Sequence, residues 1–122
     1  MHADYKSHSK NIICDANRLF KLGNKASTAE YAFSKLLAIP VRGIHLSNVG
    51  LGEKVFVIGL GMIGQLCVRG LLARGAEVIA CDPSMLRRSF AEKIGVTVFD
   101  PTDCDIVKAV KGQWNDGADV VF

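Results

Sequence analysis

Three glycines, Gly59, Gly61 and Gly64, have the spacing of a turn that holds a phosphate group, and they directly follow a short apolar run. In a strand–turn–helix unit the first glycine permits the tight turn. The second lets the backbone approach a pyrophosphate, and the third lets the helix pack closely. The helix that follows presents free N–H groups, including those of Met62 and Ile63, and its dipole favours an anion. This pattern predicts a dinucleotide-binding turn.

An acidic residue lies where such a unit needs one. Asp82 comes 18 residues after Gly64, at the end of the next apolar run. There its carboxylate can accept hydrogen bonds from the adenosine ribose hydroxyls, and its charge repels a 2′-phosphate, which favours NAD over NADP. Arg87 and Arg88 favour the opposite choice, so NADP remains the less favoured alternative. The alternative is that the glycines only form a tight turn and bind no ligand. The flanking strand and helix, together with Asp82, favour a dinucleotide-binding turn instead.

The elements that must position these residues alternate along the chain. Apolar runs bounded by turn residues predict four strands, and helical periodicity predicts the three helices between them. The predicted helices carry apolar stripes at Leu86, Phe90 and Ile94 and at Ile106, Val107 and Val110, and Thr102 and Asp105 have a capping-box-like spacing. The order predicts an α/β fold with a Rossmann-type, doubly wound parallel sheet, incomplete at about four strands. The predicted strands are 54–58, 77–81, 96–99 and 119–122, and the helices are 62–74, 84–94 and one that opens at 102–105.

A short extended and helical lead-in precedes this unit. Residues 1–22 contain brief apolar patches that predict extended pieces. Ser27 and Glu30 have the spacing of a capping box, which predicts a helix that starts near Ser27 and continues to Ile44. Pro40 interrupts the pattern, and we expect a kink or two short helices there.

The composition excludes several classes of protein. A length of 122 residues suits one domain, and a net charge of +3 without a basic run argues against nucleic-acid binding. The longest uncharged stretch, residues 55–68, is shorter than the roughly 20 residues of a membrane span. The N-terminus shows no secretory signal, so we expect a cytoplasmic protein. The four cysteines form no CxxC pair and have no histidine at a zinc-ligand interval, which predicts reduced, buried thiols.

Several motifs together resemble the medium-chain dehydrogenases, the zinc-type alcohol dehydrogenase superfamily. The resemblance covers nearly the whole chain and implies that Arg87 contacts the adenosine end of the cofactor and that Ile63 lies beneath it. The matching segments are His2-Ala3-Asp4-Tyr5, Asn17 to Leu22, Val49 to Gly61, Asp82 with Arg87, Ala91 and Gly95, and Gly117 to Val121.

The chain departs from this family in two ways. The catalytic domain, with its metal-binding Cys and GHE segment, is almost wholly absent. Ser34 and Lys35 stand where many members have a third zinc ligand, and neither is a credible one. We therefore expect no catalytic residue and no zinc in this chain. Residues 1–50 are interpreted as the tail of the catalytic domain with a connecting helix, and residues 51–122 as the first part of the dinucleotide-binding domain.

The resemblance implies the NAD-binding portion of an alcohol or polyol oxidoreductase. The parent enzyme would transfer hydride between a nicotinamide cofactor and an alcohol or carbonyl substrate, and the chain alone would be inactive. A homo-oligomer is compatible with this interpretation. One alternative is a regulatory nucleotide-sensing Rossmann domain of the potassium-transport type. Another is a non-catalytic dimerisation remnant that pairs through an exposed fourth strand.

Overall fold

The computed structural model describes residues 13, 15–18, 21, 23 and 27–122. The chain divides into two compact units, residues 1–32 and residues 33–122, which are described separately. In the first unit a 3-10 helix, η1, spans Ala16–Arg18, and α1 spans Thr28–Ala32. The extended pieces expected within residues 1–22 lie mostly outside the described residues.

The capping box predicted at the start of α1 is confirmed. The Glu30 backbone N–H donates to Ser27 Oγ at 3.2 Å, and the Ser27 N–H donates to Glu30 Oε2 at 2.5 Å. These hydrogen bonds lower the pKa of Glu30, the one from the Ser27 backbone contributing most. Each side chain thus satisfies a helix-end donor that has no partner within the helix.

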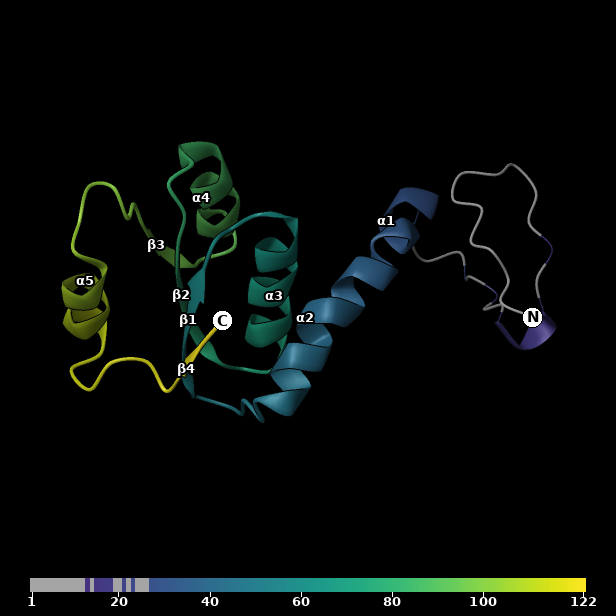
Figure 1. The fold of residues 1–122 in the computed structure, drawn as a ribbon, viewed down its shortest axis with the longest axis horizontal. Coiled ribbons are helices and arrows are strands. Elements are labelled where there is room, and N and C mark those ends of the chain that lie inside the picture. The colour runs from purple at the N-terminus through teal and green to yellow at the C-terminus, as the bar shows by residue number, and fades with distance from the viewer. Residues whose placement is uncertain (1–12, 14, 19–20, 22, 24–26) are drawn as a thin grey trace. The chain divides into compact units, whose positions relative to one another are not determined.

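The second unit is built on a parallel sheet of four strands in the order β3-β2-β1-β4 (Figure 1). In the register Val55 pairs with Val78 on one side and with Val120 on the other. This order is the first half of a doubly wound sheet with the opening strand of the second half, which confirms the predicted fold class. The strands are β1 (Lys54–Ile58), β2 (Glu77–Cys81), β3 (Thr97–Phe99) and β4 (Val120–Val121).

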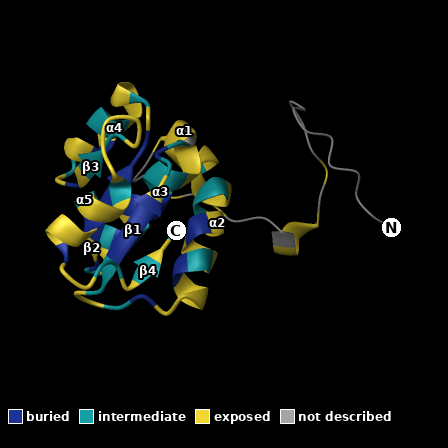
Figure 2. Cartoon of the chain, turned by 60° about the vertical axis from the view of Figure 1, so that its left-hand side comes forward, coloured by how far each residue is buried: buried dark blue, intermediate teal, exposed yellow. Residues whose placement is uncertain are grey.

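Helices cover both faces of the sheet (Figure 1). They are α2 (Ser34–Leu46), α3 (Met62–Ala73), α4 (Met85–Glu92) and α5 (Ile106–Gln113). One hydrophobic core joins α2, α3 and α4 to the sheet through residues such as Ile44, Leu71 and Ala91. A second core joins α5 to the opposite face through Val110 and Trp114. Because both faces are covered, β1 is buried along its centre (Figure 2).

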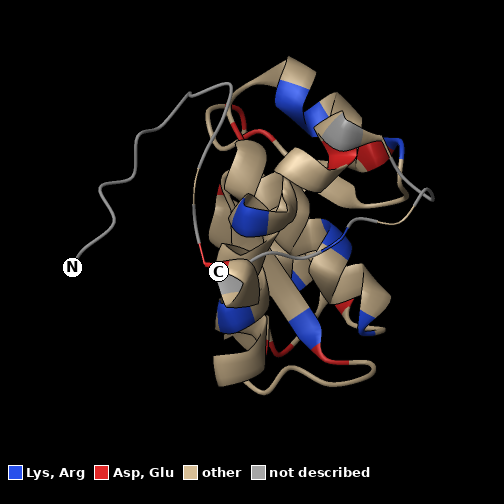
Figure 3. Ribbon diagram, turned by 90° about the vertical axis from the view of Figure 1, so that its right-hand side faces the viewer, with Lys and Arg blue, Asp and Glu red and all other residues tan. Residues whose placement is uncertain are grey.

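Charged residues lie mainly on the helices and loops, and both signs are interspersed along the ribbon (Figure 3). In β1 and β2 the charged residues, Lys54 and Glu77, are at the first position, and the rest of each strand is uncharged. Among the described residues, no helix combines the length and the apolar character that crossing a membrane requires.

Two local predictions, on α2 and α4, differ in part from the structure. Helix α2 runs through Pro40 without ending there, and the break between α1 and α2 falls at Phe33. On α4, Leu86 and Phe90 are exposed, and the buried contact is made by Ala91. Ile94, the third residue of the predicted stripe, follows α4 and packs against the same core while partly buried.

The start of α5 and the cysteines also differ from expectation. Asp105 is itself the N-cap of α5, since its side chain accepts a hydrogen bond from Lys108 N–H, so it does not pair with Thr102 as a capping box. Val107 is exposed rather than part of the buried stripe. Cys67 and Cys81 are buried and free as predicted, but Cys104 is exposed. Cys14 lies outside the described residues.

Candidate functional site

The glycine turn joins β1 to α3 at the carboxyl end of the sheet. Gly59 has φ +94°, a left-handed conformation that favours glycine, and its N–H donates to the Cys81 carbonyl at 2.8 Å. Gly61 is the N-cap of α3, and among the described residues no side chain caps this helix end. The N–H groups of the first helical turn therefore have no side-chain acceptor in a place where a bound anion would supply one.

Gly61 and Gly64 serve different purposes in this turn. A Cβ on Gly64 would lie 1.9 Å from the Gly59 carbonyl oxygen, so only glycine lets α3 begin this close to the turn. A Cβ on Gly61 would have no neighbour within 4 Å and would project into open space. That open space beside the helix N-terminus is where a pyrophosphate would fit, so the turn suits the predicted ligand.

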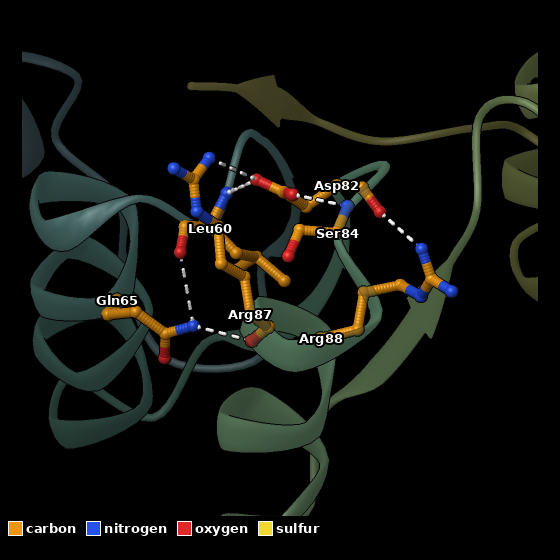
Figure 4. Close-up of polar contacts among 6 residues, drawn as sticks. All are labelled: Leu60, Gln65, Asp82, Ser84, Arg87 and Arg88. Carbon is orange, nitrogen blue, oxygen red and sulfur yellow. Dashed lines mark hydrogen bonds and ion pairs between the residues drawn. The ribbon is translucent and has the colours of Figure 1, made fainter.

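Asp82 follows β2 and is only 2% exposed. Its Oδ2 accepts a hydrogen bond from Leu60 N–H in the glycine turn, and its Oδ1 accepts one from Ser84 N–H, both at 2.8 Å (Figure 4). Burial by itself would raise the pKa of Asp82. The backbone donors Leu60 and Ser84, together with Arg87, outweigh that effect and hold the pKa below its usual value. The carboxylate is therefore ionised at neutral pH and fixed to the turn.

The two arginines on α4 are in different situations, on opposite sides of Asp82 (Figure 4). The Arg87 side chain is 57% exposed, and its Nη1 is 3.6 Å from Asp82 Oδ2. The Arg88 side chain is 15% exposed, and its Nη1 donates to the Asp82 carbonyl at 2.7 Å and contacts Asp100 Oδ2 at 2.6 Å. Arg87 can therefore move toward a ligand, whereas Arg88 is held in place.

Sequence reasoning missed two residues of this network, Gln65 and Asp100, and it named Arg88 without its partner. Gln65 Nε2 donates to the Leu60 carbonyl at 3.3 Å and to the Arg87 carbonyl at 2.8 Å, so it ties the glycine turn to α4 (Figure 4). Arg88 and Asp100 form the ion pair described above. The signal for Gln65 was available, because it is the one side chain with a strong hydrogen-bonding group between Val55 and Val68. No local pattern marks the pairing of Arg88 with Asp100.

Two other predicted site residues, Met62 and Ile63, begin α3 and are exposed, by 56% and 37%. Ile58, the last residue of β1, is 62% exposed beside them in the chain. The structure thus brings Gly59, Gly61, Met62, Ile63 and Gly64 into one turn, and joins Asp82 to it through Leu60. Arg87 reaches the same carboxylate.

The described residues also include side chains of the kinds that can bind a metal ion. Among the residues that the structure describes, no three His, Cys, Asp or Glu side chains gather in an arrangement that could hold a metal ion. Ser34 and Lys35, the positions compared with a zinc ligand, lie in the first turn of α2. No step is therefore assigned to zinc within this chain.

Comparison with known proteins identifies the relatives of this fold. Residues 62–122 match the family model described as zinc-binding dehydrogenase. A curated relative, 2-dehydro-3-deoxy-L-galactonate 5-dehydrogenase of Pseudoalteromonas atlantica, is 36% identical over 109 residues, which cover 88% of this chain and 32% of that protein.

Solved structures agree with this relationship. The crystal structure of 2R,3R-butanediol dehydrogenase from Bacillus subtilis has a TM-score of 0.78 and 31% identity, covering 84% of this chain and 30% of that one. A zinc-binding dehydrogenase from Sinorhizobium meliloti, bound to NADP, has a TM-score of 0.68 and 35% identity, covering 74% and 28%. None of these proteins supports a potassium-transport sensing domain.

The chain spans about a third of the length of the curated relatives it matches. The match includes α3, which carries the third glycine, and the segment from Asp82 to Arg88. The glycine turn, the acid after β2 and the sheet order agree with the same assignment. The chain belongs to the zinc-binding dehydrogenase family of medium-chain dehydrogenases.

Proposed function

We propose that this chain is the nucleotide-binding portion of a dehydrogenase and holds the ADP half of NAD. The observation that carries the proposal is the link between the glycine turn and the buried acid, in which Leu60 N–H donates to Asp82 at 2.8 Å. This contact joins the turn proposed to bind the pyrophosphate to the carboxylate proposed to bind the ribose, which supports a single dinucleotide site.

Each site residue has a role in this proposal. The N–H groups of Met62 and Ile63 hold the pyrophosphate, which approaches the backbone at Gly61. A carboxylate has about four acceptor positions, so Asp82 can accept from a ribose hydroxyl in addition to its backbone donors. The hydroxyl would take the place of Arg87, whose 57% exposed side chain has room to turn aside and cover the adenosine. Ile63 supplies an apolar surface beneath the cofactor.

NAD is the preferred cofactor in this proposal because of charge. A 2′-phosphate would have to approach the ionised Asp82 carboxylate, and like charges at that distance repel. Of the two cations beside Asp82 that could offset this repulsion, Arg88 is engaged with Asp100, and the exposed Arg87 is already close to the Asp82 carboxylate. The relative bound to NADP shows that this cofactor occurs in the family, so the choice needs a direct test.

The whole protein would transfer hydride between the nicotinamide and an alcohol or polyol carbon. The nicotinamide supplies the hydride chemistry when it is bound, and the residues of this chain bind and orient the cofactor. The named relatives act on a deoxy sugar acid and on butanediol, which supports a hydroxylated carbon compound as the substrate class. Residues 1–50 would then belong to the end of a catalytic domain, and residues 51–122 to the cofactor domain.

Calorimetric titration of the full 122-residue chain with NAD, NADP and ADP-ribose tests this proposal. We expect NAD and ADP-ribose to bind and NADP to bind more weakly. The Gly61→Ala variant adds a Cβ to the space proposed for the pyrophosphate, and we expect it to weaken NAD binding about tenfold or more, the value of one charge-assisted hydrogen bond.

The control is Gly112→Ala on α5, where a Cβ also has no neighbour within 4 Å. Neither variant should lower the unfolding temperature of the parent chain. Gly112→Ala, which lies in helix α5, should stabilise it by roughly 0.5–1 kcal/mol and should keep its affinity for NAD. Equal NAD binding by the Gly61→Ala variant would contradict the proposed pyrophosphate position. Tighter binding of NADP than of NAD would overturn the cofactor preference.

A further inference from the structure

Asp100 holds Arg88 in a fixed position at the edge of the proposed ribose site. Asp100 Oδ2 contacts Arg88 Nη1 at 2.6 Å, and both side chains are largely buried, with exposed fractions of 16% and 15%. The same Arg88 nitrogen donates to the Asp82 carbonyl at 2.7 Å. The guanidinium therefore lies against the backbone of the residue whose side chain would bind the ribose, and its Nη1 is engaged with two acceptors.

Asp100 is itself held from the other side. Its Oδ1 accepts hydrogen bonds from the Thr102 hydroxyl at 2.6 Å and from the Thr102 N–H at 2.9 Å. These two contacts, together with Arg88, hold the pKa of Asp100 below its usual value. Asp100 is thus an ionised, oriented partner directly after β3, and its contact favours the observed position of the Arg88 guanidinium.

An arginine beside the ribose acid is the group that accommodates a 2′-phosphate in NADP-binding proteins of this fold. A phosphate and a guanidinium form strong, often paired, charge-assisted hydrogen bonds. In this chain Nη1 of Arg88 is fixed between Asp100 and the Asp82 carbonyl, so turning the guanidinium toward a 2′-phosphate would cost a contact of the same kind with Asp100. The exchange of one ion pair for another brings little net gain, so Asp100 removes the advantage that Arg88 would offer to NADP.

We propose that Asp100 is a specificity-determining residue that disfavours NADP by withholding Arg88 from the 2′-phosphate. This inference rests on the proposed cofactor site. It assigns the selectivity to two separate acids: Asp82 repels the phosphate directly, and Asp100 acts through Arg88 without touching the ligand. Arg87, which is exposed and lies 3.6 Å from the Asp82 carboxylate, is not under this restraint.

The test compares ADP-ribose with 2′-phospho-ADP-ribose, which differ by the phosphate alone, in calorimetric titrations of the full chain. The Asp100→Asn variant removes the charge that holds Arg88 but keeps an oxygen to accept from Thr102. We expect its affinity for 2′-phospho-ADP-ribose to rise about tenfold, as one freed charge-assisted hydrogen bond would provide. Its affinity for ADP-ribose should stay within about twofold on the same scale.

Two further variants separate this mechanism from a general loss of negative charge. Asp103→Asn removes an exposed acid from the same loop and should leave the affinity ratio unchanged. In the double variant Asp100→Asn with Arg88→Met, the gain should disappear, because the cation that would meet the phosphate is gone.

The proposal is overturned if Asp100→Asn leaves the ratio of the two affinities unchanged, or if the gain persists without Arg88. In either case binding of ADP-ribose by the parent chain would leave the proposed function intact. If the parent chain binds neither ligand, the proposed function and this inference are both wrong. If Asp100→Asn does not fold, the Arg88→Met variant tests the proposal instead. An arginine that is withheld from the phosphate can be removed without loss of affinity for 2′-phospho-ADP-ribose, so a loss of that affinity would contradict the proposal.

Discussion

Replacing Gly64 with alanine should destabilise this protein because two backbone segments meet at that position. The added Cβ would lie 1.9 Å from the carbonyl oxygen and 2.9 Å from the carbonyl carbon of Gly59. Real Cβ contacts are essentially never shorter than 3.0 Å, so the turn and the start of α3 must separate by about 1 Å. Neither neighbour is a flexible side chain that could rotate away.

The size of the effect follows from two opposing contributions. Overpacking of this kind costs about 1–3 kcal/mol, and a clash with backbone on both sides belongs at the upper end of that range. Alanine is a better helix former than glycine by roughly 0.5–1 kcal/mol, which offsets part of the cost. We expect the free energy of unfolding to fall by about 2 kcal/mol, and the unfolding temperature by on the order of 10 °C for a unit of this size.

Urea unfolding followed by circular dichroism measures this change, with Gly70→Ala on the same helix as the control. A Cβ on Gly70 would meet the end of the Ile44 side chain at 3.0 Å, and that methyl group can move. The control should therefore change the free energy of unfolding by less than about 1 kcal/mol. If the Gly64→Ala variant has the same free energy of unfolding as the control, α3 does not approach the turn as closely as described.

Two further predictions concern ionisable groups. Burial raises the pKa of the Cys67 thiol to about 11, so a thiol-alkylating reagent at neutral pH should modify the exposed Cys104 well before Cys67 in peptide mapping, and the reverse order would contradict the described burial. The folded-state pKa of Asp82 is lowered from 3.8, so its contribution to stability is present above that pH and is lost as the pH falls through the lowered value. When the pH is lowered from about 6 to about 3, the free energy of unfolding, measured in urea, should therefore fall less for Asp82→Asn than for the parent chain. Identical pH profiles would show that ionisation of Asp82 does not contribute to stability.

Local spacing was enough to predict the centre of the fold. The observed bounds of β1 and β2 match the expected strands, and α3 begins at Met62 as predicted. These elements are short and strongly patterned, and their ends are marked by glycines whose conformation is set by the neighbouring residues. The position of Asp82 followed from the same count, because it ends a strand that pairs with β1.

Side-chain burial on α4 could not be predicted in the same way. Leu86 and Phe90 have helical spacing, but that spacing identifies a face of the helix and not what the face contacts. In the structure α4 meets the sheet through Ala91. The position of α4 relative to the sheet decided which of its side chains are buried. That position depends on how all the helices on this face pack against the sheet.

Spacing along the chain was enough to predict the glycine turn, the acid after β2 and the α/β class, because each depends on residues close together in the sequence. The residues alone offered Arg87 and Arg88 as neighbouring cations after Asp82, and only the family resemblance singled out Arg87. The tertiary structure separated them, because the pairing of β3 with β2 brings Asp100 to Arg88 and leaves Arg87 beside the Asp82 carboxylate. Contacts between residues on different strands are set by strand pairing, and no spacing within one segment of the sequence encodes them.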